Sequence, residues 1–445
     1  MEPTIIVSGD GHIGARPEDY RSYIDPEFRS GLDDLITENN EFLKLTASRP
    51  MVSQVVDIND DEFPGWNAQR RLRDLDHDGV AAEILHGGHQ GSVLPFYSVM
   101  NKPYPIDLRA AGARAYHRWA ADFISASDGR MLPIADPGPC VDLAETVREL
   151  EWCAGQGFVS VSLVQNTWDE SLPPVHDPYY EPIWAACEEL GLVLSVHAGW
   201  GSPQGKFWEF AKQFEKLVVG AGASDEESSV KLMEAMAASE DSPLKLDMGP
   251  RRALWQLMLG RVFDRHPDLR LVLTEVRADW LPSTLKLLDE RFESGATPLA
   301  MRPSEYFTRN CFITPSSIHL CEVEMRHEIG VDKMLFGTDY PHPEGTWPHT
   351  REWIRHAFNG VPEDELRAIL GENAIRCYNL DRDKLAAIAK RIAPSPAELL
   401  ADPDVDPQLL ESFHQRAGYT RPAEQADPEL VRELLDEDLR LVGTS

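Results

Sequence analysis

Residues 4–15 of the chain read TIIVSGDGHIGA, an apolar run followed at once by a carboxylate and an imidazole. The run from Ile5 to Val7 predicts a short buried strand that ends in Asp10-Gly11-His12. Side chains two residues apart at a strand end point to the same side, so the Asp10 and His12 side chains converge. Such an oxygen and nitrogen donor pair supplies half of a metal site. The alternative is a strand end that runs into a turn.

The composition is that of an ordinary globular enzyme. The chain has 445 residues, of which 42% are hydrophobic and 26% charged. This length fits one α/β barrel or about two to three smaller domains. The formal net charge of −31 argues against nucleic acid and anionic membranes as partners, because both would repel the chain. The partners we expect are a small-molecule substrate and further copies of the chain, in a homodimer or higher homo-oligomer.

Targeting and redox features point to the cytoplasm. The sequence contains no apolar run of about 18 residues or more, so no transmembrane helix is expected. The N-terminus has no basic region followed by an apolar one, so no signal peptide is expected. The cysteines form no C-x-x-C and favour reduced, buried thiols. They are Cys140, Cys153, Cys187, Cys311, Cys321 and Cys377.

Short apolar runs alternate with helical patterns along most of the chain. Nearly continuous apolar runs are typical of parallel strands that are covered on both faces. Eight such strands, each followed by helical sequence, predict a TIM (β/α)8 barrel, an α/β fold. A doubly wound sheet is the competitor, but no glycine-rich dinucleotide loop follows the first strand. The expected strands are 5–7, 80–86, 130–136, 158–164, 192–197, 269–275, 311–314 and 333–339.

Two segments interrupt this regular alternation. We assign residues 1–390 to the barrel, with a polar, lid-like insertion at about 200–250, after the fifth strand and above the barrel mouth. Residues 391–445 are acidic and punctuated by prolines, with a last helix near 427–439. We expect this C-terminal helical arm to wrap the barrel or a neighbouring subunit; a disordered tail is the alternative.

Aromatic residues at the start of the insertion predict an apolar surface over the mouth. They line a pocket or lid, or form a dimer contact. These residues are Trp200, Phe207, Trp208 and Phe210.

Polar residues stand at the carboxyl ends of the expected strands, where TIM barrels carry their chemistry. Two imidazoles and two carboxylates among them fit around one divalent cation: Asp10, His12, His197 and Asp339. Zinc suits this donor set, and manganese or iron are alternatives. Other strand-end candidates are His86, His89, Asp136 and Glu275.

The motifs, taken together and in this order, resemble the amidohydrolase superfamily. Within it, they are similar to the amidohydrolase-related group that contains aminocarboxymuconate-semialdehyde decarboxylase and the resorcylate-type decarboxylases. The resemblance covers about residues 4–393. It is carried by Asp10-Gly11-His12, His176 to Trp184, Leu194 to Gly199, Thr274-Glu275 and Phe336-Gly337-Thr338-Asp339-Tyr340-Pro341-His342.

The resemblance implies a role for each matched residue. Asp10 and His12 match the first-strand ligand pair, and His197 matches the fifth-strand ligand. Asp339 matches an aspartate that touches the metal and moves protons in hydrolase members. The expected strand 158–164 has no bridging lysine, and Glu275 stands where a histidine is common. Both departures point to one metal ion rather than two.

The remaining candidates surround this centre. Besides Asp339, we expect Glu275 and His342 to take part in catalysis; a hydrogen-bonded loop histidine is the alternative for His342. Glu275 holds a ligand, orients substrate or shuttles a proton, or it accepts a hydrogen bond from His197 or Arg277. For substrate binding we expect Arg277, which clamps a carboxylate or pairs with Glu275, together with His86, His89 and Trp200.

Three functions follow, in this order of preference. The first is a metal-dependent hydrolase, in which activated water cleaves a C–N or C–O acyl bond of a small carboxylated or aromatic substrate. The alternative is a nonoxidative, metal-dependent decarboxylase, a carboxy-lyase in which no water attacks. The third is a metal-free barrel that serves as a binding or assembly protein.

Overall fold

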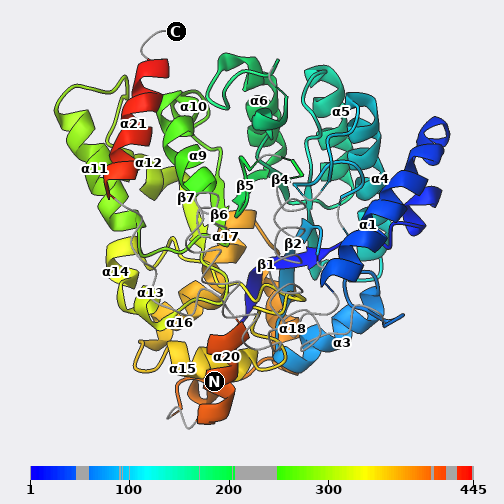
Figure 1. Ribbon diagram of the computed structural model, residues 1–445. Coiled ribbons are helices and arrows are strands. Elements are labelled where there is room, and N and C mark those ends of the chain that lie inside the picture. The colour runs from blue at the N-terminus through cyan, green and yellow to red at the C-terminus, as the bar shows by residue number, and fades with distance from the viewer. Residues whose placement is uncertain are drawn as a thin grey trace, which may run out of the picture.

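A parallel sheet of seven strands runs in chain order around the molecule (Figure 1). The strands are β1 Val7–Ile13, β2 Ala82–Gly87, β3 Met131–Ala135, β4 Ser160–Ser162, β5 Val193–His197, β6 Leu271–Thr274 and β7 Cys311–Thr314. This computed structural model describes residues 2–46, 60–89, 92, 94–99, 101–169, 171–202, 204–205, 248–401, 405–416 and 428–442.

The segment 333–340 takes the place of the expected eighth strand. On one side it pairs with β7, where the Ile313 amide donates to the Lys333 carbonyl at 3.0 Å. On the other side it meets β1, where the His12 amide donates to the Tyr340 carbonyl at 2.7 Å. Asp339 has a φ of 55°, which interrupts a regular ladder. The ring is therefore closed, and the predicted TIM barrel is confirmed; we call the junction of β1 with 333–340 the seam.

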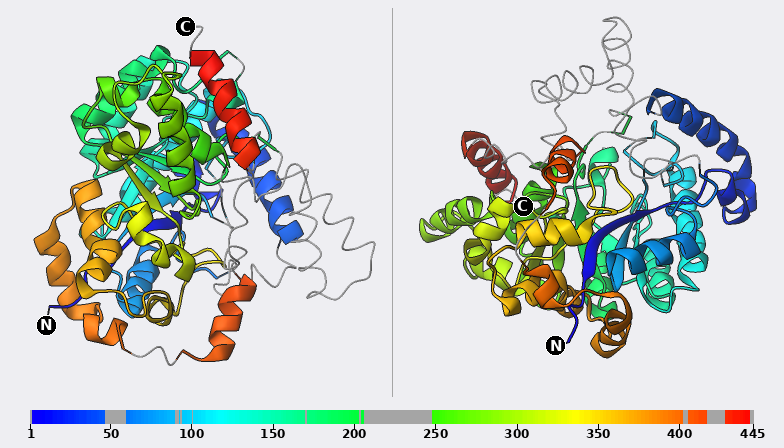
Figure 2. Two further views of the ribbon diagram at one scale, coloured as in Figure 1. Left: turned by 90° about the vertical axis from the view of Figure 1, so that its left-hand side faces the viewer. Right: turned by 90° about the horizontal axis from the view of Figure 1, so that it is seen from below.

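Helices follow the strands and pack around the sheet (Figures 1 and 2). The main ones are α1 Leu32–Thr46, α3 Ala68–Asp78, α4 Ile106–Ile124, α5 Leu143–Gly155, α6 Glu181–Leu190, α9 Met248–Leu259, α10 Val262–Arg265, α11 Leu281–Glu293, α12 Pro303–Asn310, α13 Leu320–Glu324, α14 Arg326–Ile329, α15 Thr350–Ala357, α16 Glu363–Arg367, α17 Asn373–Tyr378 and α18 Arg382–Ile392.

Apolar packing closes the end of the barrel where the strands begin. One buried cluster joins early residues of the strands, such as Val193 and Phe312, to Ile375 of α17 and Ile388 of α18. Burial of this apolar surface leaves the opposite end, where the strands finish, for polar side chains. The chain order of the strands thus brings distant strand-end residues to one face.

The described helices of the C-terminal arm contact barrel helices of the same chain. In α20 (Pro407–Arg416), the Phe413 ring lies 5.0 Å from the Trp353 ring of α15. In α21 (Pro428–Val442), the buried Asp438 carboxylate accepts hydrogen bonds from Arg252 and Trp255 of α9. Figure 2 shows these two helices at separate places on the outside of the barrel.

The structure bears on three further predictions, which concern the insertion, the cysteines and membrane-spanning helices. The aromatic residues Phe207, Trp208 and Phe210 of the lid-like insertion lie outside the described residues. All six cysteines are free thiols, and five of them are buried. Among the described residues, no helix is both long and apolar enough to cross a membrane.

Candidate metal centre

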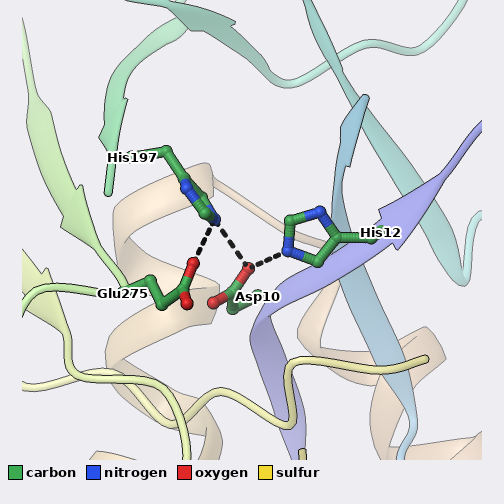
Figure 3. A group of neighbouring side chains, drawn as sticks. All are labelled: Asp10, His12, His197 and Glu275. Carbon is green, nitrogen blue, oxygen red and sulfur yellow. Dashed lines mark ion pairs between the residues drawn. The ribbon is translucent and has the colours of Figure 1, made fainter. Parts of the chain in front are cut away.

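Four side chains from three strand ends meet at the barrel mouth (Figure 3). One ligand atom of each of Asp10, His12, His197 and Glu275 lies within 4.8 Å of the others. The Asp10 Oδ1 atom is 3.4 Å from His12 Nε2 and 3.6 Å from His197 Nε2. Glu275 Oε2 lies 3.2 Å from His197 Nε2. Three of the four expected ligands are therefore brought together, with Glu275 at their edge.

Asp339, the fourth expected ligand, joins this group through His12. Its Oδ1 atom is 3.2 Å from His12 Nε2 and accepts a hydrogen bond from His342 Nδ1 at 2.8 Å. The ring centroids of His12 and His342 are 3.9 Å apart. The structure thus places His342 directly beside the group, next to Asp339.

Backbone carbonyls fix which nitrogen of each imidazole faces the group. His12 Nδ1 lies 3.0 Å from the Gly88 carbonyl, and His197 Nδ1 lies 3.1 Å from the Ala198 carbonyl. Because a carbonyl can only accept, the proton of each neutral ring is on Nδ1. In the neutral form that binds a metal, the lone pair on each Nε2 therefore points toward Asp10.

Several buried polar atoms at the centre have no hydrogen-bond partner among the described residues. They are Asp10 Oδ1, His12 Nε2, His86 Nε2, His197 Nε2 and Asp339 Oδ2. Buried acceptors that face one another are costly unless a cation or a donor lies between them. A set of two nitrogens and two carboxylate oxygens suits a zinc, manganese or iron ion. The residues present therefore fit a divalent metal.

Backbone conformation and one hydroxyl aim the carboxylates. Glu275 and Asp339 both have a φ of 55°, a left-handed conformation that non-glycine residues adopt rarely and that is concentrated at functional sites. Ser316, which follows β7, donates to Asp10 Oδ2. This bond leaves Asp10 Oδ1 facing the imidazoles. Ser316 was not predicted as a site residue, because a single serine after a strand carries no signal in the sequence.

Neighbouring imidazoles keep the carboxylates of Asp10 and Asp339 ionised. Burial alone would raise the pKa of Asp10, but the His12 and His197 imidazoles hold it well below its usual value. Burial likewise opposes ionisation of Asp339, yet the charge of His342 keeps the pKa of Asp339 below its usual value. Ionised carboxylates are the form that binds a metal.

Near β5 and β6, by contrast, the pKa of the carboxyl group is raised rather than lowered. Burial raises the pKa of Glu275 to about 7, against the charge of His197. Burial would lower the pKa of His197, but Glu275 and Asp10 raise it to about 9. A further carboxylate, Glu344, lies near Glu275 and Asp339, with the three ligand oxygens within 4.8 Å of one another. Glu344 was not among the site residues predicted from the sequence.

Of the two histidines expected to bind substrate, His86 lies at the metal centre and His89 does not. His86 Nε2 is 3.9 Å from Asp10 Oδ1, and its ring centroid is 4.5 Å from that of His197. His89 Nε2 instead lies 3.0 Å from the Gly14 carbonyl, and its ring centroid is 5.0 Å from that of Phe63. His86 therefore borders the metal centre, whereas His89 packs beside the loop after β1.

Trp200 and Arg277 are held by contacts within the fold. The Trp200 indole nitrogen donates to the Val164 carbonyl at 3.1 Å, and Trp200 is buried. Arg277 Nε donates to Glu322 Oε1 at 3.1 Å. Their roles in substrate binding stay predictions.

Comparison with known proteins identifies the family. Residues 94–380 match the family described as Amidohydrolase, so the chain belongs to the amidohydrolase family and is an enzyme of that superfamily. This confirms the resemblance seen in the sequence motifs. Gamma-resorcylate decarboxylase of Rhodococcus jostii (strain RHA1) is 26% identical over 264 residues, which are 56% of this chain and 70% of that protein.

Two further relatives are also decarboxylases. The 2-amino-3-carboxymuconate-6-semialdehyde decarboxylase of Dictyostelium discoideum is 23% identical over 328 residues, 72% of this chain and 78% of that protein. A crystal structure of dihydroxybenzoic acid decarboxylase from Polaromonas sp. JS666, with bound manganese and 2-nitroresorcinol, superposes with a TM-score of 0.53 at 19% identity. The superposition covers 86% of this chain and 99% of that chain, and shows the shared fold.

Proposed function

We propose that this protein is a divalent-metal-dependent carboxy-lyase that acts on an aromatic acid with a hydroxyl next to its carboxyl group. The observation that carries this proposal is the meeting of Asp10, His12 and His197 at one site. It is joined by the similarity of the chain to proteins that are named decarboxylases. This reverses the order of preference from the sequence alone, where hydrolysis came first.

The metal would be held by Asp10, His12 and His197, with Asp339 beside His12. We favour manganese over zinc or iron, because the Polaromonas decarboxylase has manganese bound. When bound, the cation supplies positive charge that attracts and polarises substrate oxygens.

The reaction replaces a bond between ring carbon and carboxyl carbon with a C–H bond. The ring carbon therefore needs a proton, and the carboxyl group leaves as CO2. We assign the proton transfer to Asp339, whose Oδ1 accepts from His342 Nδ1 at 2.8 Å. Burial would lower the pKa of His342, but Asp339 raises it to about 10, so His342 stays protonated beside the carboxylate. The proton would pass from His342 through the Asp339 carboxylate to the ring carbon, and solvent would then return a proton to His342.

Hydrolysis is the second candidate, and Glu275 is the observation that favours it. Its carboxylate lies 3.2 Å from His197, at a position where the resemblance leads one to expect a histidine in decarboxylases. In that reaction Asp339 would take a proton from an attacking water.

The test compares product classes on the Mn²⁺-loaded protein. We expect CO2 release from 2,6-dihydroxybenzoate or 5-carboxyvanillate and none from 2,6-dimethoxybenzoate, which keeps the two oxygens next to the carboxyl group but has no hydroxyl. Parallel assays measure acid released from aromatic amides and lactones. Acid release from those substrates, with no CO2 from any hydroxylated acid, would replace the lyase proposal with hydrolysis.

A further inference from the structure

Arg71 of α3 is a charged side chain buried completely beneath the metal centre. Its side chain is 0% exposed. Nε donates to Glu83 Oε2 of β2 at 2.7 Å, Nη1 to the His12 carbonyl at 2.7 Å, and Nη2 to the Tyr340 carbonyl at 2.9 Å. One planar guanidinium therefore ties together β2, β1 and the segment 333–340.

These contacts fall on the seam, at residues that carry or adjoin the candidate ligands. Across the seam, the Asp339 amide donates to the Asp10 carbonyl at 2.9 Å, and the His12 amide donates to the Tyr340 carbonyl at 2.7 Å. Arg71 binds the carbonyls of His12 and Tyr340 and so holds both sides of this pairing. The spacing of His12 and Asp339 therefore depends on a group that reaches neither side chain.

Gly11 shows how closely the ion pair packs against the seam. A Cβ atom at Gly11 would lie 2.9 Å from Arg71 Nη2 and 3.2 Å from Glu83 Oε1. Only a residue without a side chain leaves room for both groups at ordinary contact distances. The glycine in Asp10-Gly11-His12 is thus explained by the guanidinium and carboxylate that lie against it.

Glu83 completes the arrangement by balancing the buried charge. Both side chains of the Arg71–Glu83 pair are 0% exposed. A buried guanidinium without a counter-ion would be strongly destabilising. Three donors in a fixed plane reach three acceptors here, which the single ammonium of a lysine cannot reproduce.

We propose that Arg71 is a positioning residue that sets the spacing of Asp10, His12 and Asp339 across the seam, and thereby the affinity for the divalent cation. The inference rests on the metal site of the proposed function. Arg71 does not touch the candidate ligand atoms, so its effect on them passes through the backbone of His12 and Tyr340.

The test is a titration of the apoprotein with Mn²⁺ alone, by calorimetry and by electron paramagnetic resonance of the bound ion. For Arg71→Lys we expect about 10- to 100-fold weaker binding, the loss typical of groups that orient metal ligands, and an altered Mn²⁺ spectrum. The matched control is Arg73→Lys on the same helix, where an exposed Arg73–Glu62 pair is changed and binding should stay as in the wild type.

A purely structural role would give a different result. If Arg71→Lys lowers the melting temperature while Mn²⁺ affinity and spectrum match the wild type at a temperature where both are folded, the inference is overturned. Should Arg71→Lys not fold, Glu83→Gln takes its place, because it keeps the size and an acceptor oxygen; the same weakening is expected, and unchanged binding again overturns the inference.

Failure of the proposed function would look different again. Tight Mn²⁺ binding by the wild type and weak binding by Arg71→Lys, with no CO2 from any aromatic acid, would sustain the inference and remove the carboxy-lyase. A wild-type protein that binds no divalent cation would overturn both.

Discussion

The two sides of the candidate metal centre differ in how completely the fold encloses them. On the seam side, the Asp10 and Asp339 side chains are 0% exposed and that of His12 is 6% exposed. On the side of β5 and β6, the His197 and Glu275 side chains are 24% and 13% exposed. Backbone hydrogen bonds and Arg71 hold the seam side, whereas the other side is reached by solvent.

This difference suggests a division of labour. Rigid, buried ligands keep their geometry without help from a substrate, since packing and hydrogen bonds already fix them. Side chains that solvent reaches can exchange water for substrate atoms. We therefore expect the seam side to contribute most of the metal affinity, with His197 completing the ligand set, and substrate selection to depend mainly on Glu275.

The largest effect should come from Asp339 on the seam side. We expect Asp339→Asn to lower turnover by about 10²- to 10⁴-fold, because the amide cannot carry the transferred proton. The measurement is CO2 release with circular dichroism as the check on folding. The control is Asp332→Asn, which changes an exposed aspartate just before the same segment. An Asp339→Asn variant with wild-type turnover would remove Asp339 from the reaction.

The next effect compares the two sides directly through Mn²⁺ affinity. Asp10→Asn should weaken binding by about 100-fold or more, because Asp10 Oδ1 lies centrally between His12 and His197. Glu275→Gln should weaken it by about 10-fold or less, since Glu275 lies at the edge, beside His197. Calorimetric titration of both apoproteins measures the contrast. Equal losses would mean that the two sides do not differ in this way.

The smallest effect concerns the stability of the fold at Asp78, the last residue of α3, which is the helix that carries Arg71. Asp78 accepts a hydrogen bond from Thr350 of α15, and burial raises the pKa of Asp78 to about 7. A carboxyl whose pKa is higher in the folded state binds its proton more tightly there. Its stabilising contribution is complete below about pH 4 and is lost as the pH rises toward 7.

The matching variant removes this titration. Between about pH 5 and pH 8, the free energy of unfolding of Asp78→Asn should fall less than that of the wild type, by about 1–3 kcal/mol. Urea unfolding at both pH values measures the difference, with Asp107→Asn, an exposed residue of α4, as the control. If the free energies of unfolding of Asp78→Asn and the wild type fall equally between these pH values, the prediction is wrong.

Local sequence was enough to predict the barrel. Apolar runs followed by helical patterns mark each strand, because a strand buried on both faces must be apolar whatever its neighbours are. The irregular form of the segment 333–340 was not predictable, since the positive φ of Asp339 is imposed by its partners in β1.

The sequence by itself determined the strand-end residues, Asp10, His12, His197, Glu275 and Asp339, because in a parallel barrel all strands finish at the same mouth. Only the tertiary structure decided how they group: Glu275 beside His197, Asp339 beside His12 and His342. It also decided what stands behind them, the bond from Ser316 to Asp10 and the buried Arg71–Glu83 pair. The physical reason is that hydrogen bonds and ion pairs between residues tens to hundreds of positions apart depend on distances and angles, which no local pattern encodes.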